Sequence, residues 1–269
     1  MSEPAGRVNP IDVIRLLGVV VPAHNEQDLL PSCLASLRRA ARAVRGTPVH
    51  LVVVADASRD RTAQVARRRG ATVITTDARS VGAARAAGVR EVLRRAAHLD
   101  PADVWLATTD ADTLVPPCWL REQARYANRG WDAVAGTIRI ADWSGHQPAT
   151  RSLFHKRYGR DTGPHPHVHG ANLGFRAAAY LRAGGFPAVP TGEDHALVAA
   201  LTAAGGRVLR TRVLTVVTSA RRDARAPHGF GDYLAGLDAE ADTAPPEGTL
   251  RRITPSLVER CLGCVGECR

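Results

Sequence analysis

The sequence predicts an α/β fold in which helices flank both faces of one mostly parallel β-sheet. Short apolar runs rich in valine alternate along the chain with longer segments whose apolar residues recur at helical spacing. The chain has 269 residues, of which 45% are hydrophobic and 23% charged, a balance typical of a globular protein with a sizeable core. No internal repeat and no long linker interrupts the pattern, so we expect a single domain.

The pattern begins with a strand. Residues 16–21 form an apolar run that Pro22 ends, as expected for a buried strand. In residues 25–45 leucines recur at positions 29, 30, 34 and 37, which predicts a helix. Residues 49–55 repeat the apolar run of a buried strand, and residues 59–70 follow as a short helix that a glycine ends.

The same alternation continues to residue 140. We expect strands at residues 72–75, 104–108 and 133–140, because each is a short run rich in apolar and β-branched residues. Helices are expected between them at residues 81–98 and 116–130, the second with prolines at its start. This order gives parallel strands, and ligands of such sheets gather beyond the carboxyl ends of the strands. The polar segments that follow the strands are therefore the expected binding site.

Regular structure is expected to fade between residues 142 and 169. Glycine, proline and five of the ten histidines collect there, and the stretch 143–167 is expected to form a mobile lid over the site. Regular structure is expected again at residues 175–183, in a helix that begins near Glu193, and in a strand over residues 209–218.

The end of the chain differs in composition from the rest. The domain is predicted to span residues 1–238, and residues 239–269 are predicted to form a loosely attached tail rich in proline, glutamate and arginine. Three of the five cysteines close this tail as Cys261, Cys264 and Cys268. Three thiolates at this spacing could hold zinc with a fourth ligand, pair by oxidation, or be inert, and the sequence leaves these alternatives open.

The charge balance and the apolar runs bear on location and partners. The net charge is +10, and all but one of the basic residues are arginines, most of them in predicted helices. They indicate a solvated face, an anionic substrate or a membrane surface. Aromatic residues make up only 4% and do not alternate with basic ones, so we expect no nucleic-acid partner. No apolar run approaches the roughly 20 residues of a membrane helix, and residues 1–15 lack the apolar core of a signal peptide, so we expect a cytoplasmic protein.

Six motifs stand at or near the ends of the predicted elements. They are Pro22-Ala23-His24-Asn25-Glu26, Asp56-Ala57-Ser58-Arg59-Asp60-Arg61-Thr62, Gly82-Ala83-Ala84-Arg85-Ala86-Ala87-Gly88, Asp110-Ala111-Asp112, Gly170-Ala171-Asn172-Leu173-Gly174-Phe175-Arg176 and Gly192-Glu193-Asp194-His195. In their order and spacing, the chain resembles the family-2 glycosyltransferases from about residue 17 to residue 231. The resemblance implies the GT-A fold, a Rossmann-like sheet in one domain, and transfer of a sugar from a nucleoside diphosphate.

The resemblance also implies a nucleotide site at the ends of the first strands. It assigns nucleotide contacts to Pro22, Ala23, Asn25, Glu26, Asp56, Arg85 and Asp110. Other interpretations stay open for three of these side chains. Asp56 could be a loop carboxylate that backbone N–H groups satisfy, Glu26 could complement the dipole of the next helix, and Arg85 could be one more surface arginine.

By the same resemblance, Asp112 binds a metal ion, and Asp110 lies near the ribose and is a second candidate ligand of the metal. A divalent cation offsets the charge that grows on the departing diphosphate, and Mg²⁺ or Mn²⁺ prefers oxygen ligands. The alternative is an Asp-rich turn that caps the next helix. Many GT-A enzymes complete the metal shell with a histidine after the last core strand. Here either His228 folds back to that position, or Arg221 and Arg222 hold the diphosphate directly.

The acceptor side is expected around the fifth and sixth motifs. The resemblance implies that Asp194, beside Glu193, takes the proton from the acceptor hydroxyl, which gives inversion at the anomeric carbon. The alternative is that this pair only caps a helix. A zinc site on His165, His167 and His169 is a rival interpretation, which Pro164 and Pro166 disfavour because they interrupt a strand. The residues expected to line the acceptor pocket are His169, Gly170, Ala171 and Asn172.

The sequence therefore predicts an inverting glycosyltransferase. It would use a UDP- or GDP-activated sugar, a divalent metal ion and an unidentified acceptor hydroxyl, and the acceptor could belong to a membrane. The alternatives are a catalytically weak nucleotide-sugar-binding protein of the same fold and a basic nucleic-acid-binding module. Because Asp112 and Asp194 are both present, the sequence favours the enzyme.

Overall fold

The structure is a computed structural model that describes residues 14–159, 165–187, 189, 191–222 and 229–243. Four sequence predictions concern residues outside these ranges and are not addressed by the fold. They concern the N-terminal residues 1–13, His228, the cysteines Cys261, Cys264 and Cys268, and most of the predicted tail.

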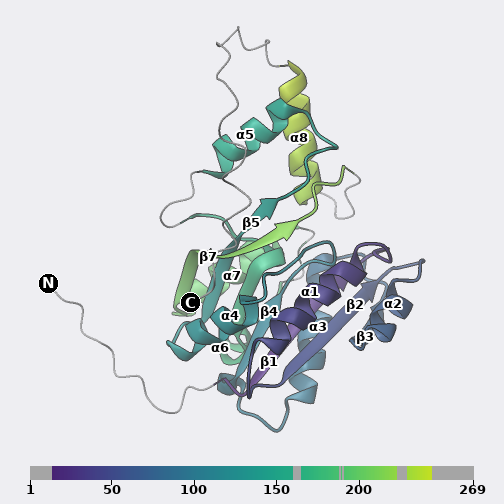
Figure 1. The fold of residues 1–269 in the computed structure, drawn as a ribbon. Helices are drawn as coiled ribbons and strands as arrows, with labels where there is room; N and C mark the ends of the chain where they lie inside the picture. The colour runs from purple at the N-terminus through teal and green to yellow at the C-terminus, as the bar shows by residue number, and fades with distance from the viewer. Residues whose placement is uncertain (1–13, 160–164, 188, 190, 223–228, 244–269) are drawn as a thin grey trace, which may run out of the picture.

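A seven-stranded sheet forms the centre of the molecule, in the order β3-β2-β1-β4-β6-β5-β7 (Figure 1). All neighbouring strands are parallel except at β6, which is antiparallel to both β4 and β5. The predicted mostly parallel sheet is therefore confirmed, and β6 is its one reversed strand among the described residues. The strands are β1 (Leu16–Ala23), β2 (Val49–Asp56), β3 (Thr72–Thr76), β4 (Val104–Thr108), β5 (Ala133–Ile140), β6 (Leu173–Arg176) and β7 (Val208–Thr218).

Helices cover both faces of the sheet. The side chains of β1 alternate between two apolar clusters, with Leu17, Val19 and Val21 on one face and Leu16 and Val20 on the other. On the first face lie α1 (Leu30–Arg42), α2 (Thr62–Arg68) and α4 (Trp119–Asn128). On the second lie α3 (Val81–Arg95), α6 (Ala177–Arg182) and α7 (Glu193–Ala203). Both faces of β1 are thus buried, which explains why its sequence is a continuous apolar run.

Helix α3 packs directly on the sheet because glycines remove side chains at the contact. A Cβ atom at Gly88 would lie 2.3 Å from Cγ1 of Val20, and one at Gly18 would lie 2.4 Å from Cγ1 of Val92. Ser80 caps the first turn of α3 by accepting a hydrogen bond from the N–H of Ala83. This helix therefore begins, with Arg85 in its second turn, at the sheet edge where the strands end.

Two helices correct the prediction for the second half of the chain. Helix α5 (Pro148–Tyr158) lies in the stretch that was expected to be irregular, and α8 (Phe230–Thr243) crosses the predicted domain boundary at residue 238. Figure 1 shows α5 and α8 side by side, beyond the ends of β5 and β7. Phe154 packs there against Leu234 and Leu237, and His146 contacts the carboxylate of Asp238 at 2.9 Å. The apolar residues of both helices are thus buried in one small cluster that also includes Ile140 of β5.

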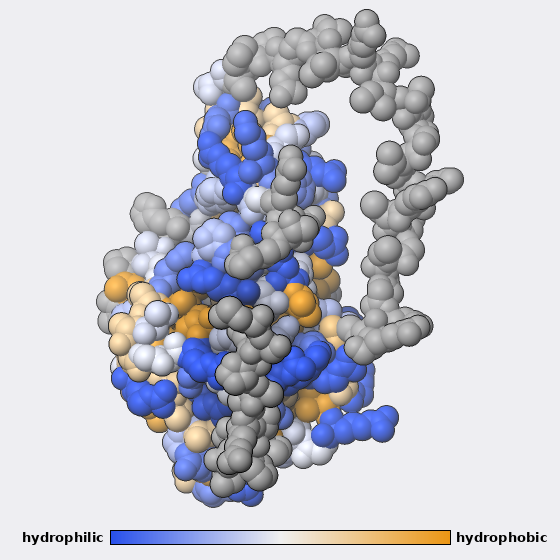
Figure 2. Space-filling model, turned by 90° about the vertical axis from the view of Figure 1, so that its left-hand side faces the viewer, coloured by the Kyte–Doolittle hydropathy of each residue, from blue (hydrophilic) through white to orange (hydrophobic). Residues whose placement is uncertain are grey.

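Hydrophilic residues cover most of the described surface on the side shown in Figure 2, with hydrophobic residues in smaller patches between them. Within the described ranges, the helices are too short or too polar to cross a membrane.

Candidate functional site

A cavity of about 860 Å³ opens at the carboxyl ends of the parallel strands. The loops after β1, β2 and β4 and the start of α3 line one part of it. The loop before β6, the starts of α7 and α8 and the end of β7 with the residues after it line another part. The sequence-predicted residues in its lining are Pro22, Ala23, Asn25, Glu26, Asp56, Arg85, Asp110, Asp112, His169, Gly170, Ala171, Glu193, Asp194 and Arg221. The structure therefore brings the expected donor and acceptor residues to one cavity.

Asp56 ends β2 and fixes the floor of the cavity. Its Oδ1 accepts hydrogen bonds from the hydroxyl of Thr76 at 2.8 Å and from the N–H of Ala78 at 2.7 Å, and its Oδ2 accepts one from the N–H of Ser80 at 3.0 Å. The side chain is buried yet lies on the cavity wall. Asp56 thus orders the loop that leads into α3, as the loop-carboxylate interpretation expected, while it borders the cavity where a nucleotide base would lie.

The loop after β1 is locked to the loop after β2. Asn25 has a left-handed backbone with φ of 53°, which asparagine tolerates better than most residues. Its Oδ1 accepts a hydrogen bond from the N–H of Arg59 at 2.8 Å, and its own N–H donates to the hydroxyl of Ser58 at 3.1 Å. His24 Nδ1 lies 2.8 Å from the carbonyl oxygen of Asp56. The side chain of Asn25 therefore shapes the loop.

Arg85 is buried between two carboxylates. Its guanidinium donates to Asp110 Oδ1 at 2.6 Å and also to Glu193 Oε1, and its side chain is only 4% exposed. Burial alone would lower the pKa of Arg85, but Asp110, Glu193 and Asp194 together raise it above its ordinary value. The arginine is therefore charged and joins the loop after β4 to the start of α7. It is therefore not the surface arginine of one interpretation.

Gly170 completes the enclosure of Arg85. A Cβ atom there would lie 2.3 Å from Cζ of Arg85 and 2.4 Å from both terminal nitrogens, so only glycine fits. The N–H of Gly170 donates to Oδ2 of Asp194 at 2.7 Å. The loop that begins at Gly170 is thus hydrogen-bonded to Asp194, next to the buried ion pair of Arg85 and Glu193.

Asp194 lies on the cavity wall in the first turn of α7. Its Oδ1 accepts a hydrogen bond from the N–H of His195 at 2.8 Å, in addition to the bond from Gly170. The N-cap of α7 is Gly192, with φ of 74°, so the interpretation of Glu193 and Asp194 as a capping pair is wrong. Glu193 is 3% exposed and paired with Arg85, which leaves Asp194 as the half-buried carboxylate of the motif that borders the cavity.

His169 is a neutral ring held by Tyr158 of α5. The hydroxyl of Tyr158 accepts a hydrogen bond from the N–H of Ile138 at 2.9 Å and lies 2.9 Å from Nε2 of His169. Burial lowers the pKa of His169 to about 4, although Asp194 opposes the shift, and burial raises the pKa of Tyr158 to about 12. Through Tyr158, helix α5 positions the residue that precedes Gly170.

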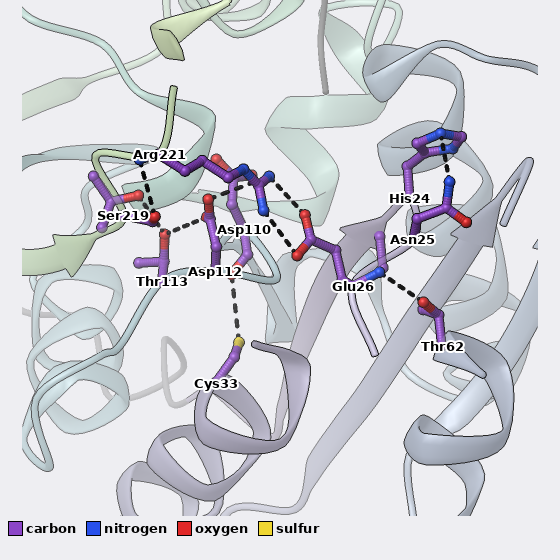
Figure 3. A network of polar contacts seen from close by, with 12 residues as sticks. His24, Asn25, Glu26, Cys33, Thr62, Asp110, Asp112, Thr113, Ser219 and Arg221 are labelled. Carbon is purple, nitrogen blue, oxygen red and sulfur yellow. Dashed lines mark hydrogen bonds and ion pairs between the residues drawn. The ribbon is translucent and has the colours of Figure 1, made fainter. Parts of the chain in front are cut away.

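Arg221 crosses the donor side of the cavity to two carboxylates (Figure 3). Its terminal nitrogens lie 2.9 and 2.6 Å from the two oxygens of Glu26, and 3.4 Å separates Nη2 from Oδ2 of Asp112. Burial and the neighbouring Asp110 raise the pKa of Asp112 to about 6, and Arg221 opposes this shift. Glu26 thus pairs with a cation from the end of β7, which its predicted role beside the nucleoside did not include.

The donor set at Asp112 suits a metal ion that also binds the substrate. No group of three or more His, Cys, Asp or Glu side chains in the described ranges converges to hold a metal ion. Asp112 and the neighbouring Asp110 supply carboxylate oxygens, which suit Mg²⁺ or Mn²⁺. Mg²⁺ in particular is commonly held by one or two carboxylates together with substrate phosphates. The residues therefore fit a divalent cation that completes its shell with a diphosphate.

Several predicted residues lie elsewhere. Asn172 is 1% exposed, and its amide group donates to the carbonyl oxygens of Thr137 and Leu214 at 2.8 Å each while accepting from the indole of Trp119 at 2.8 Å. It joins β5 to β7 and does not line the cavity, so its predicted place on the acceptor side is wrong. Arg222 is likewise outside the lining and lies 3.4 Å from Asp238 of α8.

The three alternate histidines form a stack of rings. The ring of His167 lies 5.8 Å from that of His165 and 5.9 Å from that of His169, with nearly parallel planes. These three do not form a metal-binding group, so the zinc interpretation is wrong. The ring of Tyr158 continues the stack, 4.0 Å from His167.

Sequence analysis missed the residues that α5 and α8 bring to the site. Phe230 and Tyr233 of α8 line the cavity, and Tyr158 of α5 holds His169. The signal for α5 was present in Phe154 and Tyr158, two aromatic residues one helical turn apart. The polar and basic residues between them obscured the helix.

The chain was then compared with known proteins. The family model described as Glycosyl transferase family 2 matches residues 18–182. The undecaprenyl-phosphate 4-deoxy-4-formamido-L-arabinose transferase of Pectobacterium atrosepticum is 31% identical over 129 residues, which cover 48% of this chain and 38% of that protein. The dolichyl-phosphate hexose transferase of Haloferax volcanii is 32% identical over 120 residues, which cover 45% of this chain and 46% of that protein. The chain thus spans less than half the length of the curated relatives it matches.

Solved structures resemble most of the chain. TarS of S. aureus in complex with UDP-GlcNAc has a TM-score of 0.59 and 15% identity, over 84% of this chain and 66% of that one. The mannosyltransferase PcManGT of Pyrobaculum calidifontis, in complex with GDP-Man and Mn²⁺, has a TM-score of 0.56 and 21% identity, over 87% of this chain and 76% of that one. At these identities the likeness establishes the fold, which is GT-A.

Proposed function

Because the chain belongs to glycosyl transferase family 2, we propose that it transfers a glycosyl group from a nucleoside-diphosphate sugar to an acceptor hydroxyl, with inversion at the anomeric carbon. The observation that carries the proposal is the shared cavity. Its lining includes the carboxylates expected at the donor, Asp56, Asp110 and Asp112, and the carboxylate expected at the acceptor, Asp194. A pocket of about 860 Å³ has the size of small-molecule sites in proteins.

The donor is proposed to be a UDP- or GDP-sugar. The base would lie near Asp56, the ribose near Asp110, and the diphosphate near Asp112 and Arg221. The neighbours solved with UDP-GlcNAc and with GDP-Man support both nucleotides equally. The contribution of Arg85 is indirect in this arrangement, because its guanidinium holds Asp110 and Glu193 from beneath.

Asp112, with Asp110, would hold a Mg²⁺ or Mn²⁺ ion, as the donor set allows and as the Mn²⁺ in the PcManGT structure supports. The ion would offset the charge that develops on the departing diphosphate. The residues of the chain perform the remaining work on the donor side: Glu26 and Arg221 close the wall of the cavity, and the loop that Asp56 orders shapes its floor.

Asp194 is the proposed general base. The acceptor oxygen forms a bond to the anomeric carbon, the bond from that carbon to the diphosphate oxygen breaks, and the hydroxyl proton passes to the carboxylate of Asp194. Hydrogen bonds from Gly170 and His195 hold this carboxylate in place. A hydroxyl needs such a base, whereas an ionised phosphate oxygen does not. The base therefore favours a hydroxyl acceptor over the polyprenyl phosphates in the names of the two curated relatives.

A thermal-shift titration tests the donor site. UDP or GDP should raise the melting temperature, and Mn²⁺ should increase that shift, because a ligand that binds only the folded state stabilises it. The Asp112→Asn variant should lose the increase due to Mn²⁺, while Asp142→Asn, a change at an exposed residue outside the cavity lining, should keep it. An unchanged melting temperature with every nucleoside diphosphate, with and without Mn²⁺, would contradict the proposal.

A further inference from the structure

Arg221 is the cation that holds three strand ends together at the donor site. It follows β7, while Glu26 follows β1 and Asp112 follows β4. Figure 3 shows the guanidinium between the two carboxylates, with contacts to both. Glu26 is 5% exposed and Asp112 13%, whereas Arg221 is 25% exposed at the edge of the cavity. The two carboxylates thus share one partly exposed positive charge.

The backbone on both sides of this contact is fixed. Leu114 and Val217 exchange two backbone hydrogen bonds, of 2.7 and 3.0 Å, which tie the loop of Asp112 to the end of β7. The hydroxyl of Thr113 donates to that of Thr218 at 3.0 Å. Because the two main chains are joined, the side chain of Arg221 can change partners while the carboxylates stay in place.

The two contacts of Arg221 differ in strength. With Glu26 the guanidinium forms a bidentate pair at 2.9 and 2.6 Å, the stronger geometry for these groups. The single approach to Asp112, at 3.4 Å, is longer than an ordinary charge-assisted hydrogen bond. Glu26 is therefore the stronger partner of Arg221, and the contact with Asp112 is the weaker one that a ligand can replace.

We propose that Arg221 is a resident counter-ion of Asp112, which a divalent cation replaces when the donor binds. The proposal rests on the proposed function, which assigns the metal ion to Asp112. A divalent cation and a guanidinium repel each other when they share one carboxylate, so Arg221 moves away from Asp112 and contacts the diphosphate, while its ion pair with Glu26 is kept. Arg221 thus opposes the metal ion and favours the nucleotide.

The proposal predicts effects of opposite sign. In Arg221→Gln the competing charge is lost, so Mn²⁺ alone should bind about threefold to tenfold more tightly, a modest change because the pair is partly solvated. The affinity for UDP or GDP without metal should fall in the same variant by about tenfold, the loss of one charge-assisted contact. In Glu26→Gln the guanidinium loses its bidentate carboxylate partner and should approach Asp112 more closely, so Mn²⁺ should bind more weakly than to the wild type.

The double variant Arg221→Gln, Glu26→Gln tests whether Glu26 affects the metal ion through Arg221 or binds it directly. If Glu26 acts only through Arg221, then Glu26→Gln should have no effect on Mn²⁺ affinity once Arg221 is glutamine. If Glu26 itself bound the metal ion, its replacement would weaken Mn²⁺ binding in both backgrounds. Arg94→Gln provides the matched control, because it removes one arginine from the ion pair with Glu91 on α3, outside the cavity lining.

Each full-length variant is titrated with Mn²⁺, and the free ion is measured by electron paramagnetic resonance. The affinities for UDP and GDP are measured separately by calorimetric titration. Tighter Mn²⁺ binding and weaker nucleotide binding in Arg221→Gln, with Arg94→Gln like the wild type, is the expected result. Unchanged or weaker Mn²⁺ binding in Arg221→Gln would overturn the inference, and so would the absence of Mn²⁺ binding from every variant.

An Asp112→Asn arm shows which claim has failed. If Asp112→Asn loses Mn²⁺ binding while Arg221→Gln matches the wild type, the metal site stands and the inference about Arg221 is wrong. If Asp112→Asn binds Mn²⁺ as the wild type does, the metal assignment of the proposed function is wrong, and the inference falls with it.

Discussion

Replacing Arg85 with methionine should destabilise the fold strongly. Methionine keeps most of the apolar stem but removes the charge that Glu193 and Asp110 share, and Glu193 is only 3% exposed. Breaking a buried ion pair by removing one partner costs about 3–5 kcal/mol, because the remaining charge is left uncompensated. For a domain of this size that corresponds to a fall in melting temperature of about 6–20 °C.

Thermal unfolding of the variant at neutral pH tests this prediction. The double variant Arg85→Met, Glu193→Gln should recover part of the loss, since an amide is less costly to bury than an uncompensated carboxylate. A fall of less than about 2 °C, or no recovery in the double variant, would refute the structural role assigned to this ion pair.

Three further predictions concern His169, Tyr158 and Asn172. The free energy of unfolding should fall by up to about 3 kcal/mol between pH 6.5 and pH 4, since unfolded His169 gains a proton near pH 6.5 whereas burial lowers its folded pKa to about 4. In His169→Gln the free energy of unfolding should not fall in this way between pH 6.5 and pH 4. The same pH dependence in the variant and the wild type would contradict the assignment to His169. The Tyr158→Phe variant loses the hydroxyl that contacts His169, so its kcat should fall more than its affinity for the donor, measured as Kd. Equal losses of kcat and donor affinity would contradict this prediction. Asn172→Ala should lower the free energy of unfolding in denaturant by about 3 kcal/mol, because the amide of Asn172 forms three buried hydrogen bonds with residues outside the cavity lining. The Kd for the donor should stay unchanged. A weaker donor affinity in a stable variant would support a role for Asn172 on the acceptor side.

The first half of the fold could be predicted from the sequence because its signals are local. The apolar runs of β1 and β2 are continuous since helices bury both faces of these strands, and each run has a helical segment next to it in the chain. Helix α5 carries a much weaker signal. Its buried residues are only Thr150 and Phe154, and its partner α8 begins more than 70 residues later in the chain. The apolar residues of α8 recur at helical spacing, but nothing in that pattern indicates that they pack against α5.

The site divides in the same way. Asp56, Asp112 and Asp194 line the cavity as their motif positions predicted, because Asp56 ends a strand, Asp112 is in the loop after a strand and Asp194 is in the first turn of a helix. The partners of the charged residues could not be predicted. Arg85 is in a motif whose arginine was expected at the nucleotide, and only the packed structure shows it beneath Gly170 with Glu193. The same is true of Asn172, which meets strand carbonyls that are distant in sequence.

The central claim is that Asp194 performs chemistry at a site where the donor binds independently of it. The most direct measurement compares the donor Kd and the turnover number of the wild type with those of Asp194→Asn, which keeps the size and hydrogen bonding of the side chain but removes the basic oxygen. The account predicts an unchanged Kd for the nucleotide and a fall in turnover of about 10²–10⁴-fold, the contribution of a positioned general base. A folded variant with wild-type turnover, or one whose donor affinity falls as far as its turnover, would contradict it.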